Sequence, residues 1–283
     1  MDNGPMTLIR STENLNNWRA NNPDQTVAFV PTMGALHKGH LHLIRIACQQ
    51  CDVVVVSVFV NALQFGDAND FDKYPRSLDN DYEASIAAGA SIVFAPTANE
   101  MFPDAFDGYL SPSSIANEFE GASRPGHFAG VVTVVNRLFD LVKPQMAIFG
   151  AKDFQQVAVI REMARTKHPS IKILSVKTVR DTDGLALSSR NTRLSPSARM
   201  KAKVIPDALS QLNAEFQTGQ LDSAMLKQAA LKIFATQPEL VIEYLEIVDR
   251  DSLKRQDRAQ SDSSVVLFAG IIDGIRLIDN LEL

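Results

Sequence analysis

Five short apolar segments alternate with helical patterns over the part of the chain that ends near residue 180. The segments are rich in β-branched residues, and glycines or polar residues follow most of them. Apolar runs of strand length, separated by amphipathic helices, are typical of a parallel sheet that is covered on both faces. The pattern therefore predicts an α/β, Rossmann-like parallel sheet with helices on both faces. Its predicted strands are residues 27–30, 53–60, 92–95, 146–149 and 173–179.

The pattern of hydrophobic positions changes after Gly184. Ser195-Pro196 is typical of a helix start, because proline is favoured at the first helical position. Residues 202–234 carry two helical patterns, and three strand-like segments follow at 241–248, 265–270 and 275–278. We therefore predict a Rossmann-like domain at residues 1–185 and a smaller C-terminal α+β domain at residues 186–283.

The first predicted strand leads into the most informative segment, PTMGALHKGH at residues 31–40. Pro31 and Gly34 are expected to end the strand, and a helical apolar stripe begins just after Gly39. His37 and His40 therefore lie where a strand passes into a helix, which is where ligands bind in open α/β sheets. The start of a helix offers backbone N–H groups and a positive dipole end to a phosphate. Gly39 carries no side chain, so a ligand has room to approach the backbone.

Polar segments also follow the later predicted strands. Asn61 and Gln64 follow the second strand, Lys152 and Asp153 follow the fourth, and residues 180–184 follow the fifth. The carboxyl ends of parallel strands meet at one edge of a sheet, so we expect these segments to converge. A separate loop carries Arg124 and His127 before an apolar helix that runs to about residue 142. That loop is consistent with an anion-binding loop and equally with an ordinary helix entry.

Six short motifs occur in a fixed order along the chain, from the H-x-G-H segment to LSSRN at 187–191. Together they resemble the pantothenate synthetase (pantoate–β-alanine ligase) family of the HxGH nucleotidyltransferase superfamily. The resemblance covers residues 27–191 and persists weakly to RLIDN at 276–280. H-x-G-H alone does not separate a ligase from an adenylyltransferase. The motifs are PTMGALHKGH, FVNALQF, YPR, RPGHFAGV, GAKDFQQ and LSSRN.

The resemblance implies an ATP-dependent carbon–nitrogen ligase. Pantoate carboxylate attacks the α-phosphorus of ATP to give pantoyl adenylate and pyrophosphate. The amine of β-alanine then attacks the acyl carbon, releasing AMP and pantothenate, a precursor of coenzyme A. The first step needs positioning and neutralisation of phosphate charge, and little covalent help from the protein. A lid is expected to shield the adenylate from water, and the C-terminal domain is the candidate.

The resemblance also implies site residues. His40 is the residue that the family usually assigns as proton donor, and we expect it to stabilise phosphate charge. The residues implied for catalysis are His40, His37, Lys152 and Arg190. Those implied for ATP binding are Met33, Gly34, His37, Gly39, His40, Gly150, Lys152, Asp153, Val179, Leu187, Ser188, Ser189 and Arg190. Those implied for pantoate binding are Asn61, Gln64 and Gln156, and those for β-alanine binding are Gln64 and Arg124.

Three positions depart from the family pattern. Ala62 stands where proline is usual, Ala151 stands where an acidic residue is common, and Asn80 stands where one of two acidic residues often occurs. Asp81 keeps the second of those acidic positions and is our candidate ligand for Mg²⁺. If Asp81 is not a ligand, Mg²⁺ is expected to arrive on the phosphates of ATP.

Charge and composition narrow the function classes. The 283-residue chain has a formal net charge of −5 and no Lys/Arg-rich run, which argues against nucleic acid as the main partner. It has no apolar run of membrane-spanning length, and its N-terminus lacks the pattern of a signal peptide. We therefore expect a cytoplasmic enzyme that acts on small molecules, without membrane attachment. The family resemblance implies a homodimer.

Other functions remain open at this point. An adenylyltransferase of the same superfamily would leave a stable dinucleotide and release no AMP. A non-catalytic nucleotide-binding protein is a second alternative. Cys48 and Cys51 form a C-x-x-C, the pattern of redox and zinc sites, but they follow the end of a predicted helix. A redox pair of this type sits at a helix N-terminus, so we expect these cysteines to be structural.

Overall fold

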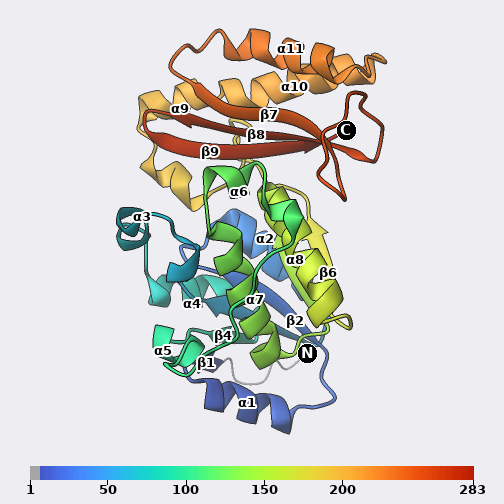
Figure 1. Cartoon of the computed structure of the whole chain (residues 1–283). Helices are drawn as coiled ribbons and strands as arrows, with labels where there is room; N and C mark the ends of the chain where they lie inside the picture. The colour runs from blue at the N-terminus through green and yellow to red at the C-terminus, as the bar shows by residue number, and fades with distance from the viewer. Residues whose placement is uncertain (1–6) are drawn as a thin grey trace. The chain divides into compact units, whose positions relative to one another are not determined.

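The computed structural model describes residues 7–283 (Figure 1). The chain divides into two compact units. The first contains residues up to Ala151 together with Gln155–Lys177, and the second contains Lys152–Phe154 and Thr178–Leu283. The second unit thus begins before the boundary expected at 185/186. Residues 1–6 are part of the N-terminal segment in which we expect no signal peptide, and they lie outside the described residues.

The first unit is built on a parallel sheet of six strands in the order β1-β4-β3-β2-β5-β6. The sheet confirms the α/β prediction and its five predicted strands. The additional strand, β1, has three residues at the sheet edge, too few to show a period in the sequence. The strands are β1 (Thr7–Ile9), β2 (Val27–Thr32), β3 (Val53–Val58), β4 (Ile92–Phe94), β5 (Met146–Gly150) and β6 (Lys172–Val176).

Helices cover both faces of this sheet. Val27 and Phe29 of β2 belong to an apolar cluster with α1, α7 and α8, whereas Ala28 and Val30 belong to a second cluster with α2. Figure 1 shows α7 and α8 in front of the sheet and α2 behind it. Burial of both faces explains why the strands read as continuous apolar runs. The helices are α1 (Thr12–Asn21), α2 (Lys38–Ala47), α3 (Ala68–Asp72), α4 (Leu78–Ala87), α5 (Ala98–Met101), α6 (Glu120–Ser123), α7 (His127–Val142) and α8 (Phe154–Lys167), with short 3₁₀ turns η1 (Ala62–Gln64), η2 (Ser114–Ala116) and η3 (Ala151–Asp153).

The sequence pattern predicted that strand β2 ends at Pro31, and this prediction was wrong. The strand continues to Thr32 and stays paired with β3, where Pro31 lies opposite Ser57. On its other side β2 pairs with β5 only at Ala28 and Phe29. Pro31 therefore lies where β2 has a neighbour on one side only, and there the missing proline N–H is tolerated.

The strand order reverses between β2 and β5. From β2 the chain proceeds outward through β3 to β4, and then returns to place β5 on the other side of β2. In open α/β sheets, ligands bind outside the carboxyl ends of the strands at this switch point. The two segments that leave it are the loop from β2 to α2, which carries His37 and His40, and the turn after Gly150.

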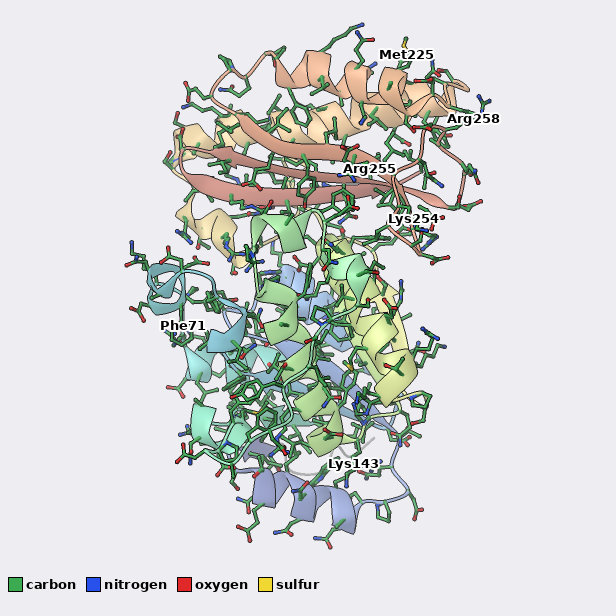
Figure 2. All side chains as sticks on the ribbon, in the orientation of Figure 1. Phe71, Lys143, Met225, Lys254, Arg255 and Arg258 are labelled. Atoms are coloured by element: carbon green, nitrogen blue, oxygen red, sulfur yellow. The ribbon has the colours of Figure 1, made fainter. Side chains whose placement is uncertain are left out.

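The second unit is a three-stranded antiparallel sheet with helices packed on it. Its order is β7-β8-β9. Phe234 of α11 stacks on Phe268 of β8 with ring centroids 4.9 Å apart. On α11, Leu226 is fully buried, whereas Met225 points outward and is 52% exposed (Figure 2). The elements are η4 (Ser189–Arg193), α9 (Pro196–Ala202), α10 (Val204–Gln217), α11 (Ser223–Phe234), β7 (Val241–Asp249), β8 (Ser264–Ile272) and β9 (Ile275–Glu282).

Two sequence expectations for the second unit are met. Ser195 caps α9 through a hydrogen bond that its side chain accepts from the Ala198 N–H, with Pro196 in the first turn. The three predicted C-terminal strands are present and longer than expected. Within residues 7–283, we find no helix with the length and apolar character needed to cross a membrane.

Candidate active site

His37 and His40 form the N-terminal cap of α2. His37 is the N-cap residue, and its Nδ1 accepts a hydrogen bond from the Gly39 N–H at 3.2 Å. His40 Nδ1 accepts from the His37 N–H at 3.4 Å, which completes a reciprocal capping box. The two rings stack with centroids 4.0 Å apart. The H-x-G-H spacing thus places two imidazole side chains where they cap the helix.

This hydrogen bonding assigns a tautomer to both rings. Because Nδ1 of His37 and of His40 accepts a backbone N–H, a neutral ring carries its proton on Nε2. Each ring then has an Nε2–H donor in a fixed orientation. Two such donors, at a helix N-terminus, suit a phosphate group.

A buried carboxylate holds the loop that leads to the histidines. Gly34 and Ala35 both have positive φ angles, 81° and 50°. Asp81 of α4 is 4% exposed and accepts hydrogen bonds from the Ala35 N–H at 3.0 Å and the Leu36 N–H at 2.8 Å. A Cβ added at Gly34 would lie 2.7 Å from Asp81 Oδ2. The loop therefore depends on both glycine at position 34 and the carboxylate at position 81.

Asp81 is also the predicted ligand for Mg²⁺. Both of its oxygens are engaged with backbone N–H groups, and its side chain is buried against the loop. Its neighbour Asn80 is exposed. Within residues 7–283 there is no group of three or more His, Cys, Asp or Glu side chains arranged to hold a metal ion. The assignment of Mg²⁺ to Asp81 stays a prediction, and the observed contacts give Asp81 a structural role in the loop.

The predicted pantoate-binding amides Asn61 and Gln64 lie together at η1. Asn61 is fully buried, and its Nδ2 donates to Gln64 Oε1 at 3.0 Å and to the Gly130 carbonyl of α7 at 3.1 Å. Asn61 Oδ1 accepts from the Leu63 N–H at 3.3 Å and so caps η1. A Cβ at Gly130 would meet Leu63 O at 2.3 Å, so only glycine permits this approach of α7 to η1. The turn forms with Ala62 in place of the family proline.

His127 joins this amide pair to Arg124. His127 is buried at the start of α7, and its Nδ1 lies 2.9 Å from the main-chain oxygen of Gln64. Its Nε2 lies 3.1 Å from Nη1 of Arg124. A carbonyl oxygen on one side and a guanidinium on the other assign the proton to Nδ1, with Nε2 accepting. Arg124 also lies 3.8 Å from Glu120. Hydrogen bonds therefore connect Asn61 and Gln64 to Arg124 through His127, a residue to which the sequence assigned no substrate.

Gln155 is a buried polar residue to which the sequence analysis gave no role. It is 3% exposed, and its Nε2 donates to the carbonyls of Ile115 and Glu118 at 3.0 and 2.8 Å. Its Oε1 accepts from the Glu120 N–H at 3.0 Å. This bond fixes the peptide after Phe119, whose φ of 53° is unusual for a residue other than glycine. Gln155 thus holds the segment before Arg124, while Gln156 beside it is only partly buried.

In the second unit, the predicted nucleotide-binding residues between Val179 and Arg190 lie on one hairpin and the 3₁₀ turn that follows it. The Leu187 N–H donates to the Val179 carbonyl at 3.0 Å, and Arg180 pairs with Ala186. Ser188 caps η4 by accepting from the Arg190 N–H at 3.2 Å. The segment Leu187–Arg190 is therefore an ordered hairpin end followed by a 3₁₀ turn.

Lys152 and Asp153 lie in η3 and belong to the second unit. Nζ of Lys152 is 3.5 Å from Asp153 Oδ1, and the Lys152 side chain is 18% exposed. The main-chain oxygen of Lys152 accepts a hydrogen bond from Asn280 Nδ2 at 2.7 Å. Ala151 is 2% exposed, so the family's common acidic residue would be buried at this position. The assignment of Met33, Gly39 and Gly150 to ATP binding stays a prediction.

The YPR motif has a structural role in this chain. Arg76 Nη2 donates to the Phe71 carbonyl at 2.8 Å, and its guanidinium lies 4.7 Å from the centre of the Phe71 ring. Phe65 packs edge-on against Phe71 and Tyr74. Figure 2 shows Phe71 on α3. Arg76 and these rings thus fold the segment between η1 and α4.

Cys48 and Cys51 lie at the C-terminal end of α2. Cys48 is the C-cap residue, and its Sγ donates to the Gly89 carbonyl at 3.2 Å. Both thiols are free, and burial raises the pKa of each above its usual value. A redox-active thiol needs the opposite shift in its pKa. The geometry therefore favours a structural role for the pair.

Comparison with known proteins agrees with this geometry. The family model for pantoate-beta-alanine ligase matches residues 7–282. The chain belongs to the pantoate–β-alanine ligase family. It is 45% identical to the pantothenate synthetase of Geobacter sp. (strain M21), covering 90% of this chain and 91% of that protein. It is also 45% identical to the pantothenate synthetase of Neisseria meningitidis serogroup A, covering 98% and 99%.

Solved structures of the family have the same fold. The crystal structure of pantothenate synthetase from Thermus thermophilus matches with a TM-score of 0.93 at 42% identity, covering 98% of this chain and 99% of that one. The pantoate-beta-alanine ligase from Francisella tularensis, complexed with beta-gamma ATP and beta-alanine, matches with a TM-score of 0.81 at 33% identity, covering 98% of both. The family resemblance stated from the six motifs is therefore confirmed.

Proposed function

We propose that this protein condenses pantoate with β-alanine to give pantothenate, with conversion of ATP to AMP and pyrophosphate. Membership of the family supports the overall reaction. The observation that carries the proposal within this chain is the imidazole cap of α2. His37 and His40 present two oriented donors at the switch point of an open parallel sheet, where the reaction needs phosphate charge to be neutralised.

In the first step, an oxygen of the pantoate carboxylate attacks the α-phosphorus, the bond to the β-phosphate breaks, and pyrophosphate leaves. His37 and His40 stabilise the charge that develops on the phosphate oxygens, as donors through Nε2. Lys152 and Arg190 neutralise the triphosphate. A lysine acts here as a mobile point charge, and an arginine as a planar, bidentate donor.

In the second step, the amine of β-alanine attacks the acyl carbon of pantoyl adenylate. The carbon–oxygen bond to AMP breaks, AMP leaves, and the amine loses a proton as the amide forms. Asn61, Gln64 and Gln156 are the proposed partners of the hydroxyls and carboxylate of pantoate. Gln64 and Arg124 are the proposed partners of β-alanine, since the guanidinium suits its carboxylate.

Mg²⁺ enters this proposal as part of the substrate, bound to the phosphates of ATP. Within residues 7–283 no group of three or more His, Cys, Asp or Glu side chains is arranged to hold a metal ion, and no step of the proposal depends on a metal held by the protein. The implied homodimer and cytoplasmic location, and the role of the C-terminal unit as a lid, also belong to the proposal.

The test is product analysis with ATP, Mg²⁺ and pantoate, with and without β-alanine. We expect AMP and pantothenate in equal amounts only when both acids are present. Pyrophosphate release with a stable dinucleotide and no AMP would instead indicate an adenylyltransferase. ATP binding by folded protein with no product in any mixture would favour a non-catalytic nucleotide-binding protein.

A further inference from the structure

An ion pair between a partly exposed arginine and a buried aspartate, in the second unit, takes no part in the chemistry proposed above. Arg180 binds Asp279 through two parallel hydrogen bonds, Nη1 to Oδ2 at 2.7 Å and Nη2 to Oδ1 at 2.9 Å. Asp279 is 4% exposed. The two residues lie far apart in the sequence, and the bidentate geometry fixes the plane of the guanidinium as well as its position.

The same guanidinium holds the hairpin before Ser188–Arg190. Arg180 Nη1 also donates to the Gly184 carbonyl at 3.0 Å, at the hairpin turn. Arg180 itself pairs with Ala186 across the hairpin. Asn191 Nδ2 donates to the Ala186 carbonyl at 2.9 Å. The end of the hairpin is thereby connected to η4 on one side and to Asp279 on the other.

Asn280 extends this network to Lys152. Its side chain is buried, and its Nδ2 donates to the Lys152 main-chain oxygen at 2.7 Å. Its main-chain oxygen accepts from Arg180 Nη2 at 3.2 Å, and its N–H donates to Asp279 Oδ1 at 2.8 Å. A single cluster therefore joins the turn of Lys152 to the hairpin that leads to Arg190.

Stability alone does not explain this arrangement. Burial of the Asp279 carboxylate costs solvation energy, and water screens the partly exposed guanidinium of Arg180, so the net stabilisation from such a pair is small. The pair fixes the hairpin that leads to Arg190 against the end of β9, and Asn280 at that end of β9 holds the turn of Lys152. Lys152 and Arg190 are the two cations that the proposed function assigns to the triphosphate. A displacement of about 1 Å in such groups costs on the order of a hundredfold in rate.

We propose that Arg180, Asp279 and Asn280 are positioning residues that set Lys152 and Arg190 together for ATP. They touch no substrate in this account and act through the two backbone segments. The inference rests on the proposed function for its kinetic measurements. It also predicts an effect on ATP binding, which can be measured without turnover.

The test is a double-mutant cycle of Asn280→Ala with Lys152→Ala. We expect Asn280→Ala to raise the KM and Kd for ATP by about five- to tenfold, the loss of one well-made hydrogen bond. The KM values for pantoate and β-alanine should change by less than about twofold. If Asn280 acts through Lys152, adding Asn280→Ala to Lys152→Ala should produce little further loss. If the Lys152 variants turn over too slowly for kinetic assays, calorimetric titration measures the Kd for ATP of all four proteins in the cycle.

The matched control is Glu243→Gln. Glu243 of β7 forms an ion pair at 2.8 Å with Arg276, which lies on β9 as Asn280 does, so this pair joins β7 to β9 whereas Asn280 joins β9 to the Lys152 turn. This variant should bind ATP as the wild type does. Additive effects in the cycle, or equal rises in all three KM values, would overturn the inference. If the wild-type protein binds ATP but makes no pantothenate, the proposed function is wrong. The double-mutant cycle measured from the Kd for ATP still tests the positioning role in that case.

Discussion

The two groups of proposed phosphate-binding residues are held in different ways. His37 and His40 are oriented by their own backbone, through a capping box that spans four residues, and by Asp81 behind the loop. Lys152 and Arg190 are oriented by residues near the C-terminus, through the Arg180–Asp279 pair and Asn280. The first arrangement is local and the second is long-range. Sequence motifs therefore reveal the first directly, whereas the second becomes visible only in three dimensions.

This difference predicts different responses to substitution. In the local arrangement, changing a histidine removes the chemical group itself, and the loss should be large. In the long-range arrangement, changing a positioning residue leaves both cations present but poorly placed, and the loss should be moderate and specific to ATP.

His40→Gln should lower kcat by roughly a hundred- to a thousandfold, as the loss of one oriented donor does in other active sites. The variant tests the local arrangement, and steady-state assays of AMP release measure it. His42→Gln is the matched control, since it lies on the same helix and has no proposed role. If both variants lost activity equally, the assignment of function to the helix cap would be wrong.

Asp81→Asn should lower kcat/KM for ATP by about ten- to a hundredfold. One of the two loop N–H groups would then face an amide NH₂ in place of an acceptor, and a buried donor without a partner is costly. Asn80→Ala, at the exposed neighbour, should have little effect. The Mg²⁺ concentration for half-maximal rate should stay the same in Asp81→Asn. A large shift in that concentration would show that Asp81 binds Mg²⁺ and does not act only through the loop.

His127→Gln should raise the KM for β-alanine by about tenfold and leave the KM for ATP near the wild-type value. His127 connects Gln64 to Arg124, and glutamine is too flexible to hold both partners at their present distances. Steady-state kinetics with each substrate varied in turn measures this. A rise confined to ATP would show that this network serves the phosphates and not the acceptor.

Replacing Cys48 and Cys51 together with serine should leave kcat/KM within about twofold of the wild type. The proposed phosphate-binding residues, His37 and His40, lie at the N-terminal end of α2, whereas the cysteines lie at its C-terminal end. Since burial raises the pKa of both thiols, less thiolate is present at pH 7 than in an ordinary cysteine, and alkylation should be slow and speed up as pH rises. Loss of ATP-dependent activity in the double variant would contradict the structural role.

The sequence predicts much of this molecule because several signals agree. Buried parallel strands appear as apolar runs, and Gly39 with His37 and His40 marks the helix start. Other features needed coordinates. The three-residue strand β1 shows no period, and the continuation of β2 through Pro31 depends on which neighbours pair there. The roles of Asp81 and Gln155 depend on backbone N–H and carbonyl groups that no motif encodes. RLIDN was visible as a weak likeness, but its link to Lys152 was not.

The most direct test of the central claim is pantoate-dependent exchange of labelled pyrophosphate into ATP, measured without β-alanine. The account places pantoate activation on the phosphate-binding groups alone, before the amine is needed. It therefore predicts exchange that requires pantoate and Mg²⁺ and is lost in His40→Gln. Exchange that occurs only after β-alanine is added, or exchange that persists without pantoate, would contradict the adenylate mechanism and the role given to the histidine cap.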